Sequence, residues 1–189
     1  MTCSDCFVPS ITDYIGYYED CMSENICDDI MSHNWSMKKS TYANNEGTTK
    51  TSDERVKMND VWVEQNMPYY ENLKTTFIKV VEKYGTDHKE FSCQHYTNFR
   101  LNKYSEGGFM SKHCDNIHHS HGQKYGFPQV SALLFLNDDY EGGEFVVCHD
   151  WGIFPKKGSS IIFPSNFIYP HEVLPITKGT RWSAITWLM

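Results

Sequence analysis

The alternation of apolar and polar positions in the first 90 residues predicts two amphipathic helices. The first follows Ser23, a residue type that caps helix N-termini, and ends near Asn34. Its apolar positions recur at helical spacing and are Ile26, Cys27, Ile30 and Met31. The second begins at Pro68 and stops at Gly85. Its apolar side consists of Tyr70, Leu73, Phe77, Val80, Val81 and Tyr84.

The segment between these helices, residues 40–59, is rich in Thr, Asn, Ser and charged residues. A polar stretch of this length predicts a long exposed loop. A short strand at Arg55 to Met58 would return the chain toward the fold.

From about residue 90 onward, short apolar runs bounded by Gly, Pro, Asn and Asp predict β-strands. The runs are 92–101, 130–136, 145–148, 159–163 and 181–188. The pair Gly142-Gly143 indicates a bulge or turn, because no helix follows it. Runs this short favour a sandwich or barrel over βαβ units. We therefore expect a mainly β (α+β) fold, a jelly roll of the double-stranded β-helix or cupin-like kind, with the two helices supporting one face.

The length of 189 residues suits one domain. We expect residues 1 to about 90 to form helical support and mobile loops, and about 91–189 the jelly-roll core. The net charge of −7 argues against a broad nucleic-acid-binding surface. No run approaches the roughly 18 apolar residues of a membrane span. The first ten residues lack the features of a secretory signal, so we expect a cytoplasmic protein.

Two groups of metal-binding residue types are open to more than one interpretation. The seven cysteines are scattered, which favours reduced thiols, although Cys3 and Cys6 have the spacing of half a zinc site. A group of three histidines, His118, His119 and His121, is more typical of a solvated loop beside a pocket than of a second metal site. The sequence leaves open whether either group binds a metal.

The strongest chemical pattern is a pair of histidines with one carboxylate. His113 and Asp115 are separated by one residue, so on a strand both side chains would point to the same face. Such pairs are common by chance, as His88 and Glu90 illustrate. His171 follows a buried-looking strand and supplies a third ligand. Two histidines and one carboxylate form the facial triad that binds Fe(II) and leaves positions open for O₂ and a chelating cosubstrate.

A cation and a hydroxyl occur together ten residues beyond His171. Arg181 and Ser183 would share a face of one strand. A guanidinium with a hydroxyl makes a good carboxylate clamp, and its distance from the metal ligands suits a dicarboxylate that also chelates iron.

The segment from about Tyr104 to Trp187 resembles the Fe(II)- and 2-oxoglutarate-dependent dioxygenases, in particular the prolyl 4-hydroxylase-like branch. The resemblance covers a little under half of the chain, and its elements occur in the family's order. They are Tyr104-Ser-Glu-Gly107, His113-Cys-Asp115, Leu-Phe-Leu136-Asn137, Tyr140-Glu-Gly142-Gly143-Glu144, Pro155-Lys-Lys-Gly158-Ser159, His171-Glu-Val173, Gly179-Thr-Arg181-Trp-Ser183 and Trp187.

The resemblance implies a role for each site residue. The ligands of Fe(II) would be His113, Asp115 and His171, with O₂ as the second cosubstrate and ascorbate as the reductant. Arg181, helped by Ser183 and Tyr104, would bind the distal carboxylate of 2-oxoglutarate, and Trp187 would wall the pocket. One departure is Phe135, which stands where some relatives place a second tyrosine beside the cosubstrate. Ser183 would compensate for that missing hydrogen bond.

The implied activity is hydroxylation of a C–H bond, with decarboxylation of 2-oxoglutarate to succinate and CO₂. We expect prolyl residues of a peptide or protein as the substrate, with the loop at 40–59 closing over it. The same chemistry on a free amino acid or another side chain is an alternative. Nucleobase demethylation is disfavoured by the net charge. A catalytically silent jelly roll that holds zinc would leave Arg181 and Ser183 without a purpose. The oligomeric state stays open.

Overall fold

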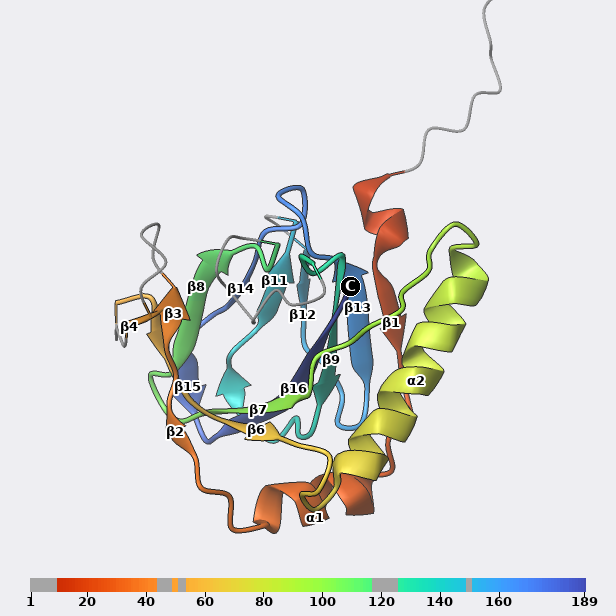
Figure 1. The fold of residues 1–189 in the computed structure, drawn as a ribbon. Helices are drawn as coiled ribbons and strands as arrows, with labels where there is room; N and C mark the ends of the chain where they lie inside the picture. Colours follow the sequence, from red (N-terminus) through yellow and green to blue (C-terminus); the bar gives the residue numbers. More distant parts are fainter. Residues whose placement is uncertain (1–9, 44–48, 51–53, 117–125, 149–150) are drawn as a thin grey trace, which may run out of the picture.

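The computed structural model describes residues 10–43, 49–50, 54–116, 126–148 and 151–189 (Figure 1). Cys3, Cys6, His118, His119 and His121 lie outside these residues, as do parts of the segment 40–59. None of the helices in the described ranges is both long and apolar enough to cross a membrane.

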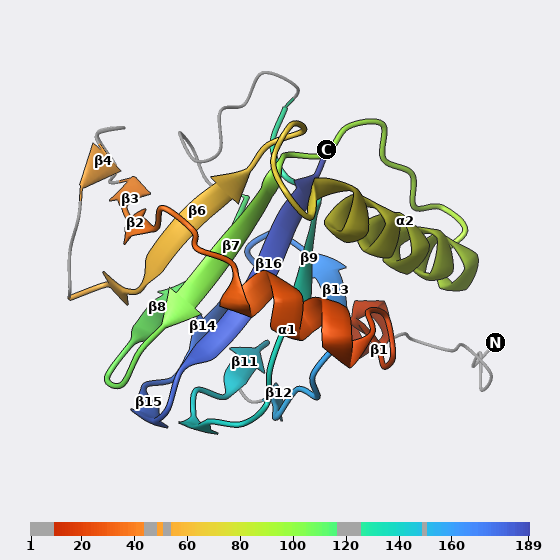
Figure 2. The same cartoon turned by 90° about the horizontal axis from the view of Figure 1, so that it is seen from below.

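Two antiparallel sheets form the centre of the described fold, which confirms the predicted jelly-roll fold. The larger sheet has seven strands, and we call it the major sheet. Their order across the sheet is β1 (Gly16–Tyr18), β13 (Ser160–Pro164), β9 (Val130–Phe135), β16 (Arg181–Leu188), β7 (Phe99–Tyr104), β6 (Asn59–Val63) and β2 (Lys38–Lys39). Figure 2 shows β6, β7, β16, β9 and β13 side by side.

The second, five-stranded sheet is the minor sheet. Its order is β12 (Trp151–Ile153), β11 (Phe145–Val147), β14 (His171–Val173), β8 (Phe109–His113) and β5 (Val56–Lys57). Two further strand pairs are separate from these sheets: β10 (Glu141–Gly142) with β15 (Ile176–Lys178), and β3 (Tyr42–Ala43) with β4 (Thr49–Lys50). The pairing of β10 with β15 shifts register between Glu141 and Gly142, so the bulge predicted at the glycine pair is present.

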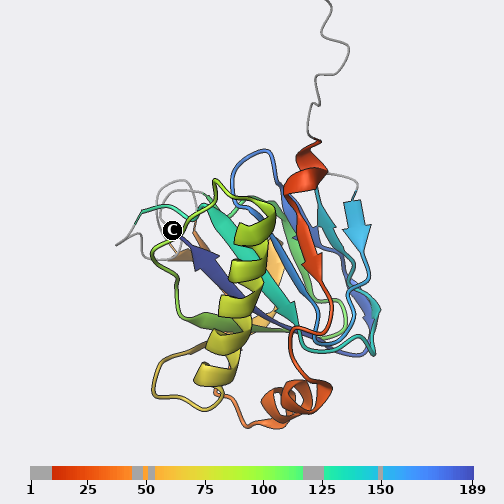
Figure 3. The same cartoon turned by 90° about the vertical axis from the view of Figure 1, so that its right-hand side faces the viewer.

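Two helices cover the outer face of the major sheet. They are α1 (Glu24–Ser32) and α2 (Tyr70–Asp87), preceded by the short 3₁₀ helix η1 (Ile11–Tyr14). The predicted apolar sides pack inward, with Cys27 and Ile30 of α1 and Leu73 and Phe77 of α2 buried in one cluster with the sheet. Figure 3 shows α2 lying along the major sheet, away from the strands of the minor sheet.

Strand β16 separates two hydrophobic clusters by simple alternation. Trp182, Ala184 and Leu188 pack in the cluster that contains the helices. Ile185 and Trp187 face the other cluster, which lies between the two sheets. Because successive side chains on a strand point to opposite faces, Arg181 and Ser183 share the interior face with Trp187.

Two predictions about the first half of the chain need correction. Helix α2 continues past Gly85 to Asp87, because the His88 N–H bonds to the Tyr84 carbonyl at 2.9 Å and the His88 ring packs on Tyr84. One glycine in the last turn costs only about 1 kcal/mol, which these contacts offset. The segment 40–59 is also not simply an exposed loop, since Ser40, Val56 and Met58 are buried. The strand predicted near residues 55–58 is present as β5.

The buried side of α2 predicts a clear difference between two substitutions. Leu73→Ala removes a fully buried side chain and should lower the free energy of unfolding by about 2–5 kcal/mol. Ile78 is 41% exposed on the same helix, so Ile78→Ala should lower the free energy of unfolding by about 0.5 kcal/mol or less. Urea denaturation followed by circular dichroism measures both. Equal losses would mean that α2 does not pack on the sheet as described.

Candidate functional site

Two histidines meet because their strands are neighbours in the minor sheet. His113 is the last residue of β8, His171 is the first of β14, and the two are direct partners in the antiparallel register. Their ring centroids are 4.3 Å apart. Phe163 and Phe145 pack against the His171 ring, so the pair lies at the surface of the interior cluster.

Asp115 completes the group, but not by the strand alternation that the sequence suggested. Strand β8 ends at His113, and Asp115 lies in a bend two residues later. The bend still brings its carboxylate to the histidines. Oδ1 lies 3.4 Å from His113 Nε2, and Oδ2 lies 3.4 Å from His171 Nε2. One ligand atom from each residue falls within 4.8 Å of the others, so the structure brings together the three predicted ligands.

A buried hydroxyl fixes the orientation of this carboxylate. Ser131 of β9 donates to Asp115 Oδ2 at 2.6 Å, and its oxygen lies 2.8 Å from Ser165 Oγ. All three side chains are buried. Sequence reasoning missed Ser131, whose only signal was its position on a strand face that also carries Leu133 and Phe135 of the interior cluster.

Backbone carbonyls set the tautomer of each histidine. His113 Nδ1 lies 2.8 Å from the Ser111 carbonyl, and His171 Nδ1 lies 3.2 Å from the Tyr169 carbonyl. A carbonyl only accepts, so each Nδ1 carries the proton and donates it. In a neutral imidazole, the lone pair is then on Nε2, which faces Asp115. This is the arrangement that metal-binding histidines adopt.

Opposing effects act on the Asp115 carboxyl group. Burial alone would raise its pKa, because the charged form loses water. When Nε2 of each histidine also carries a proton, the positive charge of His171 and hydrogen bonds donated by both rings outweigh burial, and the net pKa lies well below the usual range. Asp115 is therefore a carboxylate anion at neutral pH, as a metal ligand would be. Two imidazole nitrogens with one carboxylate are the donor set of the facial triad, so the residues present fit Fe(II).

The second part of the site is a buried guanidinium. Arg181 is fully buried at the start of β16, with its guanidinium 5.2 Å from the Tyr104 ring centroid and 5.3 Å from that of Phe135. Nη1 makes one long contact of 3.4 Å with Ser183 Oγ, while Nε and Nη2 have no hydrogen-bond partner. In the part of the chain that the structure describes, no carboxylate lies within 4 Å of this group.

An uncompensated buried charge is costly, so this environment fits an anion. A second donor lies nearby. The hydroxyl of Tyr140 is buried beside Arg181 and makes no hydrogen bond of good geometry. Burial raises the pKa of Tyr140, and the positive charge of Arg181 and a weak hydrogen bond with it only partly oppose the increase. Gly143, with a φ of +68°, leaves room here, because a Cβ would clash with the Ile176 side chain and crowd the Tyr140 ring at 3.2 Å and Arg181 Cδ at 3.3 Å. The sequence assigned no role to Tyr140, although it precedes the predicted glycine bulge.

The remaining predicted residues lie on the same interior face. Tyr104 is the direct partner of Arg181 across β7 and β16, and burial raises the pKa of its hydroxyl. Trp187 packs against Trp62 with the ring centroids 5.9 Å apart, and the guanidinium of Arg100 lies 4.8 Å from its ring; the sequence singled out neither neighbour. The rings of Phe145 and Phe135, 6.2 Å apart, connect the histidines with Arg181 through one cluster.

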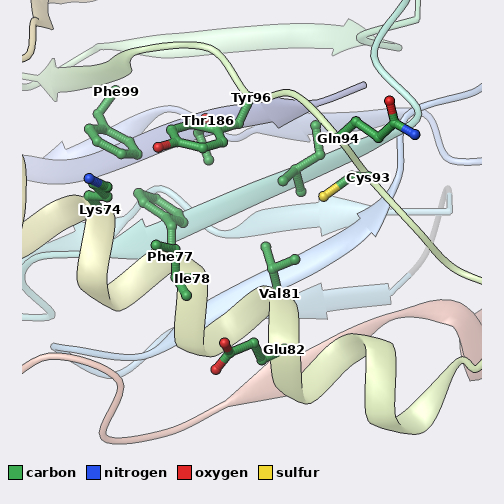
Figure 4. Close-up of a pocket in the computed structure, with 11 residues that line it drawn as sticks. Lys74, Phe77, Ile78, Val81, Glu82, Cys93, Gln94, Tyr96, Phe99 and Thr186 are labelled. Atoms are coloured by element: carbon green, nitrogen blue, oxygen red, sulfur yellow. The ribbon is translucent and has the colours of Figure 1, made fainter.

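A separate pocket of about 210 Å³ lies on the opposite face of the major sheet. Figure 4 shows its lining, which comes from α2, from the segment between Cys93 and Phe99, and from Thr186 of β16. Thr186 alternates with Arg181, Ser183 and Trp187 on β16, so this pocket does not open onto the triad.

Comparisons with known proteins agree with this geometry. Residues 99–189 match the family model described as the 2OG-Fe(II) oxygenase superfamily. The chain is also similar to a PKHD-type hydroxylase of Cupriavidus pinatubonensis, with 37% identity over 96 residues, 47% of this chain and 41% of that protein. It is equally similar to a PKHD-type hydroxylase of Aliarcobacter butzleri, with 37% identity over 95 residues and the same coverage. The chain thus spans about two fifths of the length of these curated relatives.

Solved structures share the fold over almost the whole chain. A viral collagen prolyl hydroxylase from Paramecium bursaria Chlorella virus-1 has a TM-score of 0.69 at 17% identity, covering 93% of this chain and 95% of its own. A prolyl hydroxylase from Trichoplax adhaerens, solved with a peptide fragment of hypoxia-inducible factor, has a TM-score of 0.72 at 16% identity. It covers 94% of this chain and 84% of its own. The double-stranded β-helix fold predicted from the strand pattern is therefore confirmed.

The hydrogen bond from Ser131 predicts a specific defect in metal binding. Ser131→Ala leaves the Asp115 carboxylate without its orienting donor, and affinity for a divalent transition metal should fall roughly 10- to 100-fold. Ser160→Ala is the matched control, since this equally buried serine of the neighbouring strand bonds only to the Leu133 carbonyl. Anaerobic calorimetric titration measures both variants. Unchanged metal affinity of Ser131→Ala would show that Ser131 does not orient Asp115 for metal binding.

Proposed function

We propose that this chain is an Fe(II)- and 2-oxoglutarate-dependent dioxygenase that hydroxylates prolyl residues of a peptide or protein, since residues 99–189 match the family model of the 2OG-Fe(II) oxygenase superfamily. The observation that carries the proposal is the buried Arg181, whose guanidinium has two unpartnered nitrogens in the same interior cluster as the triad. A metal site alone would not require a buried cation. A metal site that also binds a dicarboxylate needs one, because the second carboxylate must be neutralised inside the protein.

The three converging residues have separate tasks in binding iron. His113 and His171 present Nε2, because their Nδ1 protons are held by backbone carbonyls. Asp115 supplies the negative charge, and Ser131 holds its Oδ2 in place. Three ligands leave coordination positions open. When bound, Fe(II) supplies the activation of O₂ that couples decarboxylation of 2-oxoglutarate to succinate and CO₂ with insertion of the second oxygen atom into a substrate C–H bond.

The buried end of the interior is suited to the distal carboxylate of 2-oxoglutarate. Arg181 offers Nε and Nη2, and Ser183 lies beside Nη1. Tyr140 adds a buried hydroxyl beside Arg181, which supplies a hydrogen bond that Phe135 cannot. Charge-assisted bonds of this kind fix the orientation of the cosubstrate as well as its position. Tyr104, Phe135 and Trp187 exclude water from the same space. We expect ascorbate to serve as the reductant.

The choice of a prolyl substrate rests on similarity. Two solved structures of similar fold are named as prolyl hydroxylases, and one of them holds a peptide. In this chain, β5 is an edge strand of the minor sheet, and β6 is next to the edge strand of the major sheet. Strand β6 places Trp62 directly opposite Arg100. We propose that residues 1–189 act as one catalytic domain and that the region before β5 contributes to substrate binding.

The reaction is tested by incubating the protein with Fe(II), 2-oxoglutarate, ascorbate and proline-containing peptides. Mass spectrometry should detect addition of one oxygen atom to the peptide, with an equal amount of succinate formed. Free L-proline is included as the small-molecule alternative. Absence of succinate with every substrate would favour the silent zinc-binding jelly roll instead.

Removal of the anionic ligand should separate binding from folding. Asp115→Ala should abolish iron binding and turnover, while the circular dichroism spectrum stays that of the wild type. Glu172→Ala is the control, because Glu172 neighbours His171 on β14 but pairs with Lys112 at 3.3 Å at the surface. The control should retain both properties. Full activity of Asp115→Ala would refute the assignment of the triad.

Replacing Arg181 by an unbranched apolar side chain should affect the free energy of unfolding differently with and without cosubstrate. Without it, Arg181→Met should be at least as stable as the wild type, because an unpaired buried charge is removed. In the presence of Mn(II), 2-oxoglutarate at 100 times its Kd should stabilise the wild type by about 2.7 kcal/mol and the variant by close to zero. Lys178→Met, an exposed cation paired with Glu141, should keep the full effect. Chemical denaturation measures all three proteins.

A further inference from the structure

A second arginine lies on the interior face of the major sheet, away from the proposed cosubstrate clamp. Arg100 of β7 is the direct partner of Trp62 on β6 and of Ile185 on β16. It shares its strand face with Asn102 and Tyr104, since these residues alternate by two. Its guanidinium lies 4.8 Å from the Trp187 ring centroid, and Trp62 stacks on the same tryptophan.

Among the described residues, none forms an ion pair with Arg100. Its Nε is buried and has no hydrogen-bond partner, while the side chain as a whole is partly exposed. Over the described ranges, no carboxylate lies within 4 Å of the guanidinium. The nearest acid by register is Asp60, which is opposite Asn102 and therefore only diagonal to Arg100. A cation in this position can take a further anionic partner.

The guanidinium of Arg100 leans toward Trp187, at the end of the interior face that carries Ser131, and away from the clamp. Trp187 is the direct partner of Ser131, which binds Asp115. Only β16 separates β9, which carries Ser131, from β7, so the two backbones are roughly 10 Å apart. Along β7, four residues separate Arg100 from Tyr104, the partner of Arg181, a distance of roughly 13 Å. Arg100 and Arg181 therefore serve different parts of the interior.

We propose that Arg100 binds a carboxylate of the substrate, next to the position that is hydroxylated. This proposal rests on the proposed dioxygenase function and adds a substrate class to it. The guanidinium fork binds a carboxylate through two parallel hydrogen bonds, and the faces of Trp62 and Trp187 hold the adjoining apolar part of the substrate. The carboxylate comes from an Asp or Glu that flanks the target residue in a peptide, or from the α-carboxylate of a free amino acid.

A variant of Arg100 tests this role against simple packing on Trp187. Arg100→Met keeps an unbranched apolar stem against the indole and removes the charge. Lys103→Met is the matched control, because Lys103 lies on the same strand with its Nζ 5.0 Å from the ring of Trp182, on the helix-covered face. Tryptophan fluorescence of the Fe(II) protein with 2-oxoglutarate, under nitrogen, measures substrate binding without turnover.

Three ligands distinguish the sources of the carboxylate: a neutral proline-containing peptide, the same peptide with Glu beside the proline, and free L-proline. The wild type should bind one carboxylate ligand roughly ten- to a hundredfold more tightly than the neutral peptide. Arg100→Met should lose this preference and keep its affinity for the neutral peptide, while Lys103→Met should behave as the wild type. The ligand that loses affinity identifies the source.

Two further outcomes separate this proposal from the function on which it rests. If Arg100→Met keeps the preference, or the wild type has none, Arg100 is a packing residue and the proposal is wrong, even when succinate is formed normally. Succinate formation without substrate should be equal in the wild type and Lys103→Met, because Lys103 lies on the helix-covered face. If no protein forms succinate under any condition, the proposed function fails, and the binding titration still reports on Arg100.

Discussion

The alternation of side chains along β16 organises the rest of this molecule. All eight residues of this strand are buried, and it lies between β9 and β7 near the middle of the major sheet. One set of its side chains packs against α1 and α2, and the other set faces the minor sheet. A shift by a single residue would exchange the two sets and place Trp182 where Arg181 now lies. The helices on the outer face therefore help to hold the polar groups of the inner face in position.

The inner face carries polar groups that a purely structural core would not contain. Unpartnered buried atoms occur on Arg181, Tyr140, Asn102 and Arg100, and all four residues belong to the interior or its edge. Each such group lowers stability, by about 1–3 kcal/mol for a lost hydrogen bond. The outer cluster, which is almost entirely apolar, offsets this cost. A concentration of such groups on the inner face is the pattern expected where ligands complete the structure, although Ser40 near the edge strand β2 also has an unpartnered buried hydroxyl.

Much of the fold followed from the sequence because periodicity and turn residues are local signals. Both helices and the strands at 130–135 and 181–188 were predicted, as was the alternation that places Arg181 and Ser183 on one face. Short strands were missed where their pairing is non-local. Gly16–Tyr18 and Asn59–Val63 become strands only because β13 and β7 are available beside them. Asp115 was predicted on a strand and lies in a bend, since no local signal marked the end of β8 at His113.

For the candidate site, the sequence predicted the residues with recognisable chemistry but not the residues that support them. Histidine, aspartate and arginine stand out in a sequence, whereas Ser131 is one serine among many until the register of β9 and β16 places it beside Asp115. Tyr140 and Arg100 became notable only when their polar atoms proved to lack partners. Such information depends on three-dimensional contacts between distant segments.

The stretch from Val56 to Val63 belongs to both layers, with β5 hydrogen-bonded to β8 and β6 hydrogen-bonded to β7. This stretch connects the two sheets along one edge, and its residues Val56 and Trp62 pack in the same interior cluster. Separation of the layers on this side would require main-chain hydrogen bonds to break, which is slower and more costly than a side-chain rotation. The distance between the two sheets beside Arg100 is thus set by the backbone, and a ligand bound there must fit this distance.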